Sequence, residues 1–197
     1  KGLGHALQFG LMRCSYDWVF RMDADDINRP DRFQTQIDFI LKNNLQICGG
    51  HIEEFSSSPG DLSRKRLVPL DVEGSFCKKR NPFNHMTVGD SKNIVLAAGG
   101  YEDVPGYEDY FLWLKMLKRG IRASNLDSIL VDARVGNGML ERRTGYGFFI
   151  NELQFQKRAL QEGMWGRYVF IINVFRRGVP RLFPKWIMYI IYKSLRK

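Results

Sequence analysis

The chain has 197 residues and carries 30 Lys and Arg against 21 Asp and Glu, so its formal net charge is +9. Apolar residues make up 44% of it and aromatic residues 13%, which argues against wholesale disorder and favours one domain, alone or with an appendage. Its three cysteines show no CxxC spacing, which argues against a disulfide framework or a zinc site and fits a reducing cytosol.

The positive charge is concentrated near the end of the chain. Residues 1–141 carry 18 basic and 19 acidic side chains, whereas residues 142–197 carry 12 and 2. A nucleic-acid binder with a basic face over the whole domain is not expected to show this division. We therefore expect two parts, a catalytic domain over 1–143 and a basic helical tail over 144–197.

The first 50 residues predict alternating helices and strands. A leucine at every fourth position favours a helix, aromatic runs favour buried strands, and paired glycines are expected to end a strand. The expected elements are a helix over 3–14, a strand over 16–22, a polar loop over 23–28, a helix from Pro30 to about 43, and a short strand over 45–48 closed by Gly49-Gly50. This order indicates an α/β fold with the polar loop at the carboxyl end of a strand, where open α/β sheets bind ligands.

The rest of the chain predicts a looser arrangement. The expected elements are a flexible loop over 55–66, a turn and extended segment over 81–88, a loop over 99–106, a helix over 108–119, a strand over 126–131 and a helix over 144–162. Val88 is followed by Gly89-Asp90-Ser91 rather than by further apolar residues, which leaves the pairing of the extended segment open.

The acidic loop Asp23-Ala24-Asp25-Asp26 is the most informative motif. Three carboxylates within four residues repel one another unless a cation lies among them. Their hard oxygen atoms suit Mg²⁺ or Mn²⁺, which bind through one or two carboxylates plus substrate phosphates. The alternative is a solvated acidic turn near the N-terminus of the following helix.

The run GLGHALQFGL…YDWVFRMDADDINRPDRFQTQ resembles the family 2 glycosyltransferases with the GT-A fold, especially the amylovoran-type transferases of bacterial polysaccharide synthesis. The resemblance extends across Leu3–Arg143 and also covers the Pro30-Asp31-Arg32 motif that opens a helix. It implies a partial, Rossmann-like GT-A fold and a metal-bound nucleotide diphosphate. Asp25 is then the metal ligand, Asp23 contacts the sugar of the nucleotide, and Asp26 supports either role.

A second acidic pair, Glu108-Asp109, stands at the start of the expected helix over 108–119. Inverting glycosyl transfer needs a base near the acceptor hydroxyl, and a carboxylate suffices if it lies within hydrogen-bond reach. The alternative is a pair of charges that stabilises a helix N-terminus. In the resembled family this position (GYEDYFLWLKML) holds the base, which implies that Asp109 is the base and Glu108 an acceptor-site contact.

Two further candidates are basic. Arg142-Arg143 could neutralise the departing diphosphate, because guanidinium groups match phosphate oxygens; the alternative is a solvated basic pair. His85 is a lone histidine that either lines the acceptor or metal site or has a structural role.

The basic tail combines aromatic and cationic residues. Its longest uninterrupted apolar run, Trp186–Tyr192, is far shorter than the roughly 20 residues of a spanning helix, so we do not expect it to cross a bilayer. The composition suits a helix in an anionic membrane interface, at about 1 kcal/mol for each basic residue. Packing against the catalytic part or a partner subunit is the alternative; nucleic acid is not expected, because no binding module is recognisable.

Together with these motifs, the resemblance implies an inverting, Mn²⁺- or Mg²⁺-dependent glycosyltransferase that uses a nucleotide-sugar, by family habit a UDP-sugar, and a lipid-linked glycan acceptor. We expect a cytoplasmic, peripheral location on the inner face of the membrane. The resembled family normally begins with further βα units that precede the position of Lys1. We therefore expect these residues alone to bind UDP-sugar poorly and to be marginally stable. The alternative is a catalytically incomplete, membrane-associated or scaffolding fragment.

Overall fold

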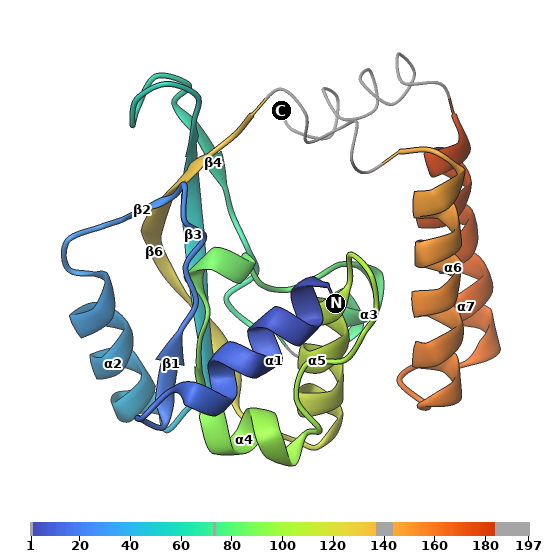
Figure 1. The fold of residues 1–197 in the computed structure, drawn as a ribbon, viewed down its shortest axis with the longest axis horizontal. Helices are drawn as coiled ribbons and strands as arrows, with labels where there is room; N and C mark the ends of the chain where they lie inside the picture. Colours follow the sequence, from blue (N-terminus) through green and yellow to red (C-terminus); the bar gives the residue numbers. More distant parts are fainter. Residues whose placement is uncertain (1, 73, 137–143, 184–197) are drawn as a thin grey trace. The chain divides into compact units, whose positions relative to one another are not determined.

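The computed structural model describes residues 2–72, 74–136 and 144–183 (Figure 1). The described residues form two compact units. The first holds those up to Val135 except Val104–Tyr107, and the second holds Val104–Tyr107 together with those beyond Val135. Nothing in the sequence indicated that Val104–Tyr107 groups with the later residues.

A mixed sheet lies at the centre of the first unit. The strands described are β1 (Trp18–Phe20), β2 (Ile27–Asn28), β3 (Ile47–Phe55), β4 (Arg64–Arg66), β5 (Gly89–Ser91) and β6 (Ala123–Arg134). Their order is β1-β5-β3-β6-β2, and β4 pairs with β3 beside this path. β3 and β6 pair in parallel, whereas the other described pairs are antiparallel.

Helices cover both sides of this sheet (Figure 1). They are α1 (Leu3–Arg13), α2 (Arg32–Asn43), α3 (Ser75–Lys79), α4 (Lys92–Ala97) and α5 (Glu108–Lys118). On the α2 side, Ile40 packs with Leu45 and Cys48, and Trp18 and Phe20 of β1 close this cluster. The helices predicted over 3–14, from Pro30 and over 108–119 are confirmed, with small differences at their ends.

The predicted end of a strand at Gly49-Gly50 is wrong, because β3 continues through both glycines to Phe55. These glycines allow neighbouring side chains to approach the strand closely. A Cβ atom on Gly49 would collide with the Asn125 side chain and lie 2.9 Å from the Phe83 ring, and one on Gly50 would lie 2.5 Å from Leu130 Cδ1. Gly49 and Gly50 therefore allow close packing against β3 and do not end the strand.

The segment after His85 also differs in detail from the expectation. His85–Thr87 forms a 3-10 turn, and the extended strand that follows is the polar β5. Asp90 of β5 lies opposite Val19 of β1 on one side and opposite Ile47 of β3 on the other. Gly89 makes this pairing possible, because a Cβ there would lie 2.5 Å from the Phe20 ring.

The remaining strand predictions are confirmed with changed lengths. The strand predicted over 16–22 is the shorter β1, and the one predicted over 126–131 is the longer β6. The loop predicted over 55–66 ends in β4.

Beyond Val135, the described residues of the second unit form two helices and a helical extension. α6 (Tyr146–Gln161) confirms the helix predicted over 144–162; α7 (Arg167–Asn173) continues into a π-helical turn at Val174–Gly178 and a 3-10 turn at Val179–Leu182. Phe155 and Trp165 form its buried aromatic centre, with ring centroids 5.7 Å apart. None of the described helices is long and apolar enough to span a membrane. Trp186–Tyr192 lies outside the described residues.

Candidate active site

The acidic loop leaves the sheet at the carboxyl end of β1, as predicted, and Arg32 of α2 fixes its shape. The Arg32 guanidinium is fully buried and donates to the Arg21 carbonyl oxygen (2.9 Å), to Gln36 Oε1 (2.9 Å) and to Asn28 Oδ1. Burial lowers the pKa of Arg32 to about 10, so its side chain is still cationic at neutral pH. Because Arg21 and Asn28 flank the loop, this one side chain holds both of its ends.

Three predicted site residues meet at the start of this loop. His85 Nε2 lies 2.8 Å from Asp23 Oδ2, and Arg21 Nη2 lies 3.6 Å from Asp23 Oδ1. The other end of the Arg21 guanidinium contacts the Asp109 carboxylate at the start of α5. The hydrogen bond with His85 is the main reason why the pKa of Asp23 lies below its usual range. Asp23, His85 and Asp109, which are far apart in sequence, are thus joined through Arg21.

Sequence reasoning missed Arg21. Its signal was a single cation in the aromatic-rich segment 16–22, separated from the acidic loop only by Met22. The Arg21 and Asp109 side chains are only 12% and 13% exposed, so their charges are poorly screened by solvent.

The other two loop carboxylates have different surroundings. Asp25 is exposed, and its backbone oxygen accepts a hydrogen bond from Arg134 Nε at 3.3 Å. Asp26 is buried, and its Oδ1 accepts from the Arg134 backbone N–H at 2.8 Å, which ties the loop to β6. Burial raises the pKa of Asp26 above its ordinary value.

Glu108, the predicted acceptor contact, is buried where α1 approaches α5. A Cβ on Gly4 of α1 would lie 3.2 Å from Glu108 Cγ, so this glycine allows the close approach. Its role toward an acceptor stays a prediction. Arg142-Arg143 lies outside the described residues.

The charge of Asp109 acts on two further groups, the Asp90 carboxyl and the Tyr101 hydroxyl. Neither was identified as a site residue from the sequence. Burial raises the pKa of Asp90 to about 7; the Asp109 charge acts in the same direction and Arg21 opposes it. Burial also raises the pKa of Tyr101, and the charges of Asp90 and Asp109 add to this effect. No pattern around the short polar β5 marked Asp90 as buried.

The raised pKa of Asp90 predicts that its contribution to folding weakens as the pH rises. Between its ordinary value of 3.8 and about 7, the folded protein holds a proton that the unfolded chain has released. Wild type should therefore lose about 2 kcal/mol of unfolding free energy from pH 5 to pH 8 that Asp90→Asn, which has no group to titrate there, does not lose. Urea denaturation at both pH values measures this difference. The exposed Asp38→Asn is the control, and parallel pH curves for Asp90→Asn and wild type would contradict the prediction.

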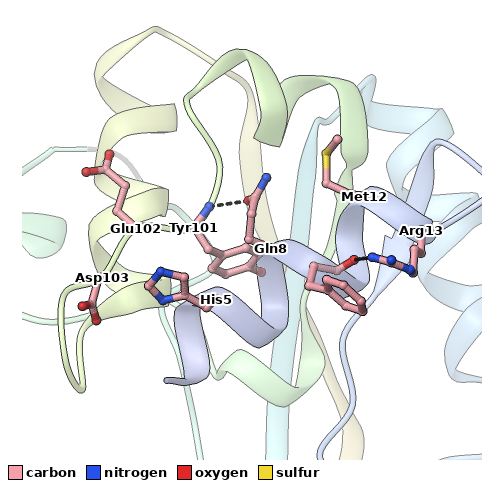
Figure 2. Close-up of a pocket in the computed structure, with 8 residues that line it drawn as sticks. His5, Gln8, Met12, Arg13, Tyr101, Glu102 and Asp103 are labelled. Carbon is pink, nitrogen blue, oxygen red and sulfur yellow. Dashed lines mark hydrogen bonds between the residues drawn. The ribbon is translucent and has the colours of Figure 1, made fainter. Parts of the chain in front are cut away.

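A cavity of about 530 Å³ lies between α1 and the loop after Gly100 (Figure 2). It is lined by His5, Gln8, Phe9, Met12, Arg13, Tyr101, Glu102 and Asp103. Gln8 Oε1 accepts a hydrogen bond from the Tyr101 N–H at 2.9 Å, which holds the loop against α1. The cavity contains none of the predicted site residues and shares only Tyr101 with the surroundings of Asp109.

Comparisons with known proteins identify the family of this chain. Residues 1–97 match the family described as glycosyl transferase family 2. An uncharacterized glycosyltransferase of Haemophilus influenzae is 43% identical over the whole chain, which covers 74% of that relative. The chain belongs to glycosyl transferase family 2.

Two other relatives of this family 2 glycosyltransferase carry more specific names. The UDP-Gal:alpha-D-GlcNAc-diphosphoundecaprenol beta-1,3-galactosyltransferase of Escherichia coli is 39% identical over 98% of the chain, which covers 71% of that relative. The amylovoran biosynthesis glycosyltransferase AmsE of Erwinia amylovora is 34% identical over the whole chain, which covers 74% of it. The resemblance to amylovoran-type transferases is confirmed.

Solved structures show the same fold at low identity. S. aureus TarS 1-349 in complex with UDP-GlcNAc matches 81% of the chain with a TM-score of 0.58 and 15% identity. The mannosyltransferase PcManGT of Pyrobaculum calidifontis, in complex with GDP-Man and Mn²⁺, matches 89% with a TM-score of 0.56 and 17% identity. This family 2 chain spans about half of each of these two chains (47% and 48%). The predicted α/β, partial GT-A fold is confirmed.

The residues of the acidic loop fit a divalent cation. Asp26 Oδ2 is buried and has no hydrogen-bond partner among the described residues, and the exposed Asp25 carboxylate is its neighbour in the chain. Within the described part of the chain, no three His, Cys, Asp or Glu side chains are grouped so as to hold a metal ion by themselves. A cation here would therefore need substrate or water oxygens as further ligands, as Mg²⁺ commonly does.

Proposed function

We propose that this family 2 protein is an inverting, metal-dependent glycosyltransferase that moves a sugar from a UDP-sugar to a lipid-linked glycan in bacterial polysaccharide synthesis. The observation that carries the proposal is the link from His85 through Asp23 and Arg21 to Asp109. Asp23, which we assign to the donor side, and Asp109, which we assign to the acceptor side, contact the two ends of one guanidinium. A reacting anomeric carbon must lie between these same two sides. The names of the galactosyltransferase relative and of the TarS complex support the acceptor and donor classes.

On the donor side, Asp25 would hold Mn²⁺ or Mg²⁺ against the diphosphate, with Asp26 in support and Asp23 directed to the nucleotide's sugar. When bound, the cation supplies Lewis-acid stabilisation of the charge on the leaving diphosphate. Arg142-Arg143 would add positive charge to the same group. Arg32 holds the loop in one conformation, so the carboxylates do not have to be ordered when the donor binds.

On the acceptor side, Asp109 accepts the proton of the attacking hydroxyl, and Glu108 and His85 contact the acceptor. The acceptor oxygen forms its bond to the anomeric carbon on the face opposite the diphosphate. The bond from that carbon to the diphosphate breaks, and its electron pair leaves with UDP. Arg21 contacts Asp109 and so orients this carboxylate before the acceptor binds.

The test is release of UDP from a panel of UDP-sugars by the complete enzyme in the presence of a GlcNAc-diphospholipid. We expect release that requires both the acceptor and Mn²⁺ or Mg²⁺ and that EDTA abolishes. Release that continues in EDTA would contradict the metal dependence. If the complete enzyme neither releases nor binds UDP, the scaffolding alternative is favoured.

The second unit presents a face suited to a membrane surface. Tyr168, Ile171 and Phe175 follow one another at helical spacing and are exposed, and the exposed Arg167 and Arg176 flank them. Exposed aromatic and basic residues on one helix fit the boundary of an anionic bilayer. We propose that the protein is a peripheral protein of the cytoplasmic membrane face, where its lipid-linked acceptor would lie.

Replacing Tyr168, Ile171 and Phe175 together with serine should lower binding to phosphatidylglycerol-containing vesicles about tenfold, because each exposed ring or branched chain loses its apolar contact. Vesicle co-sedimentation measures this. Leu41→Ser removes an equally exposed apolar side chain from α2 and is the control. Equal sedimentation of the triple variant and the control would contradict the membrane face.

A further inference from the structure

Four residues that closely precede the proposed base Asp109 in the chain belong to the second unit. Val104–Tyr107 belongs to the second unit, whereas Asp103 before it and Glu108 after it belong to the first. Tyr107 is therefore the last residue of the second unit before α5, and only Glu108 separates it from Asp109. Any restraint on Tyr107 reaches Asp109, in the first turn of α5, through two peptide bonds.

The second unit restrains Tyr107 strongly. Its hydroxyl donates to Glu152 Oε2 at 2.6 Å, and its ring stacks on Phe155 with centroids 4.6 Å apart and an angle of 11° between the planes. The Arg177 guanidinium lies 5.7 Å from the centre of the Tyr107 ring and 3.1 Å from Glu152 Oε1. A hydrogen bond, a ring stack and a cation thus fix the position of one side chain.

Glu152 is a fully buried acidic residue that the proposed chemistry does not use. Its Oε1 accepts from Gln156 Nε2 at 2.8 Å, and Gln156 Oε1 accepts from Asn173 Nδ2 at 3.2 Å. Burying a carboxylate is costly unless it is paired and hydrogen-bonded, whereas an apolar contact would have joined the helices without that cost. A buried network with all these partners specifies one geometry.

The position of Arg177 is a second indication that the buried network around Glu152 has a functional role. Arg177 lies in the π-helical turn at Val174–Gly178, and π-helical turns are rare and occur frequently at functional sites. Burial and the Glu152 charge raise the pKa of Tyr107, so its hydroxyl stays protonated and able to donate.

We propose that Tyr107, held by Glu152 and Arg177, is a positioning residue for Asp109, on which it acts along the chain through Glu108. The inference rests on the proposed role of Asp109. A small displacement of a reacting group can cost two orders of magnitude in rate, so a restraint two residues away is sufficient to matter.

The test is Tyr107→Phe, which removes the hydrogen bond to Glu152 and keeps the ring. We expect kcat to fall about tenfold, the KM for the UDP-sugar to stay unchanged, and the amides of residues 108–112 to exchange with deuterium faster. Tyr146→Phe makes the same chemical change at an exposed position of α6 and should match wild type in all three measurements. Turnover and exchange of Tyr107→Phe equal to those of Tyr146→Phe would overturn the proposal.

A second variant separates positioning from general stability. Glu152→Leu, which removes the acceptor of the Tyr107 hydroxyl, should reproduce the loss of kcat, and adding Tyr107→Phe to it should cost little more, since both changes remove the same hydrogen bond. Fully additive losses would overturn the proposal. If Asp109→Asn keeps its turnover, the proposed base is wrong, yet faster exchange at 108–112 in Tyr107→Phe would still support the coupling, and unchanged exchange would still refute it.

Discussion

Replacing Asp109 with asparagine in the complete enzyme is expected to lower the rate of sugar transfer about a thousandfold, within the range that a general base contributes. Asparagine keeps an oxygen that can accept a hydrogen bond from Arg21, so the site should remain assembled. It cannot take the proton of the acceptor hydroxyl. Turnover is measured as acceptor-dependent UDP release, and UDP affinity is measured by calorimetry, where no change beyond about twofold is expected.

Asp38→Asn is the matched control, because it removes an exposed carboxylate of α2 that belongs neither to the acidic loop nor to the Glu108-Asp109 pair. It should leave turnover and UDP affinity as in wild type. Turnover of Asp109→Asn close to that of this control would remove Asp109 from the role of base. A parallel loss of UDP affinity would instead assign Asp109 to donor binding.

Arg32→Met is expected to lower the unfolding free energy by about 3 kcal/mol, because buried acceptors lose their donor. Methionine replaces much of the buried volume, but the Arg21 carbonyl and the Asn28 and Gln36 side chains lose the guanidinium that joins them. UDP affinity should fall as well, since both ends of the acidic loop are released. Chemical denaturation and calorimetry measure the two effects.

Arg122→Met provides the control, as an exposed arginine that should change the unfolding free energy by no more than about 0.5 kcal/mol. Arg32→Lys should recover only part of the loss, because an ammonium group does not reproduce the planar fork that reaches three acceptors. Full recovery by lysine would show that charge alone, and not this geometry, holds the loop.

The candidate site was partly predictable. The acidic loop, His85 and Glu108-Asp109 were recognisable from carboxylate spacing and from the family resemblance, and the structure brings Asp23, His85 and Asp109 together. Arg21, Asp90 and Tyr101 were not identified. Each of them matters through residues that are distant in sequence: these contact Arg21, bury Asp90 and place charges near Tyr101, and a local pattern does not contain that information.

The sequence by itself determined the features that depend on near neighbours: the helices over 3–14, 108–119 and 144–162, the acidic loop after a strand, and the basic charge after residue 141. These follow from side-chain periodicity and composition, which act within a few residues. Only the tertiary structure decided that β3 runs through Gly49-Gly50, that a polar β5 is buried, and that Val104–Tyr107 belongs to the helical unit. These three outcomes depend on close approach and burial between segments distant in the chain, whose energies no short window of sequence contains.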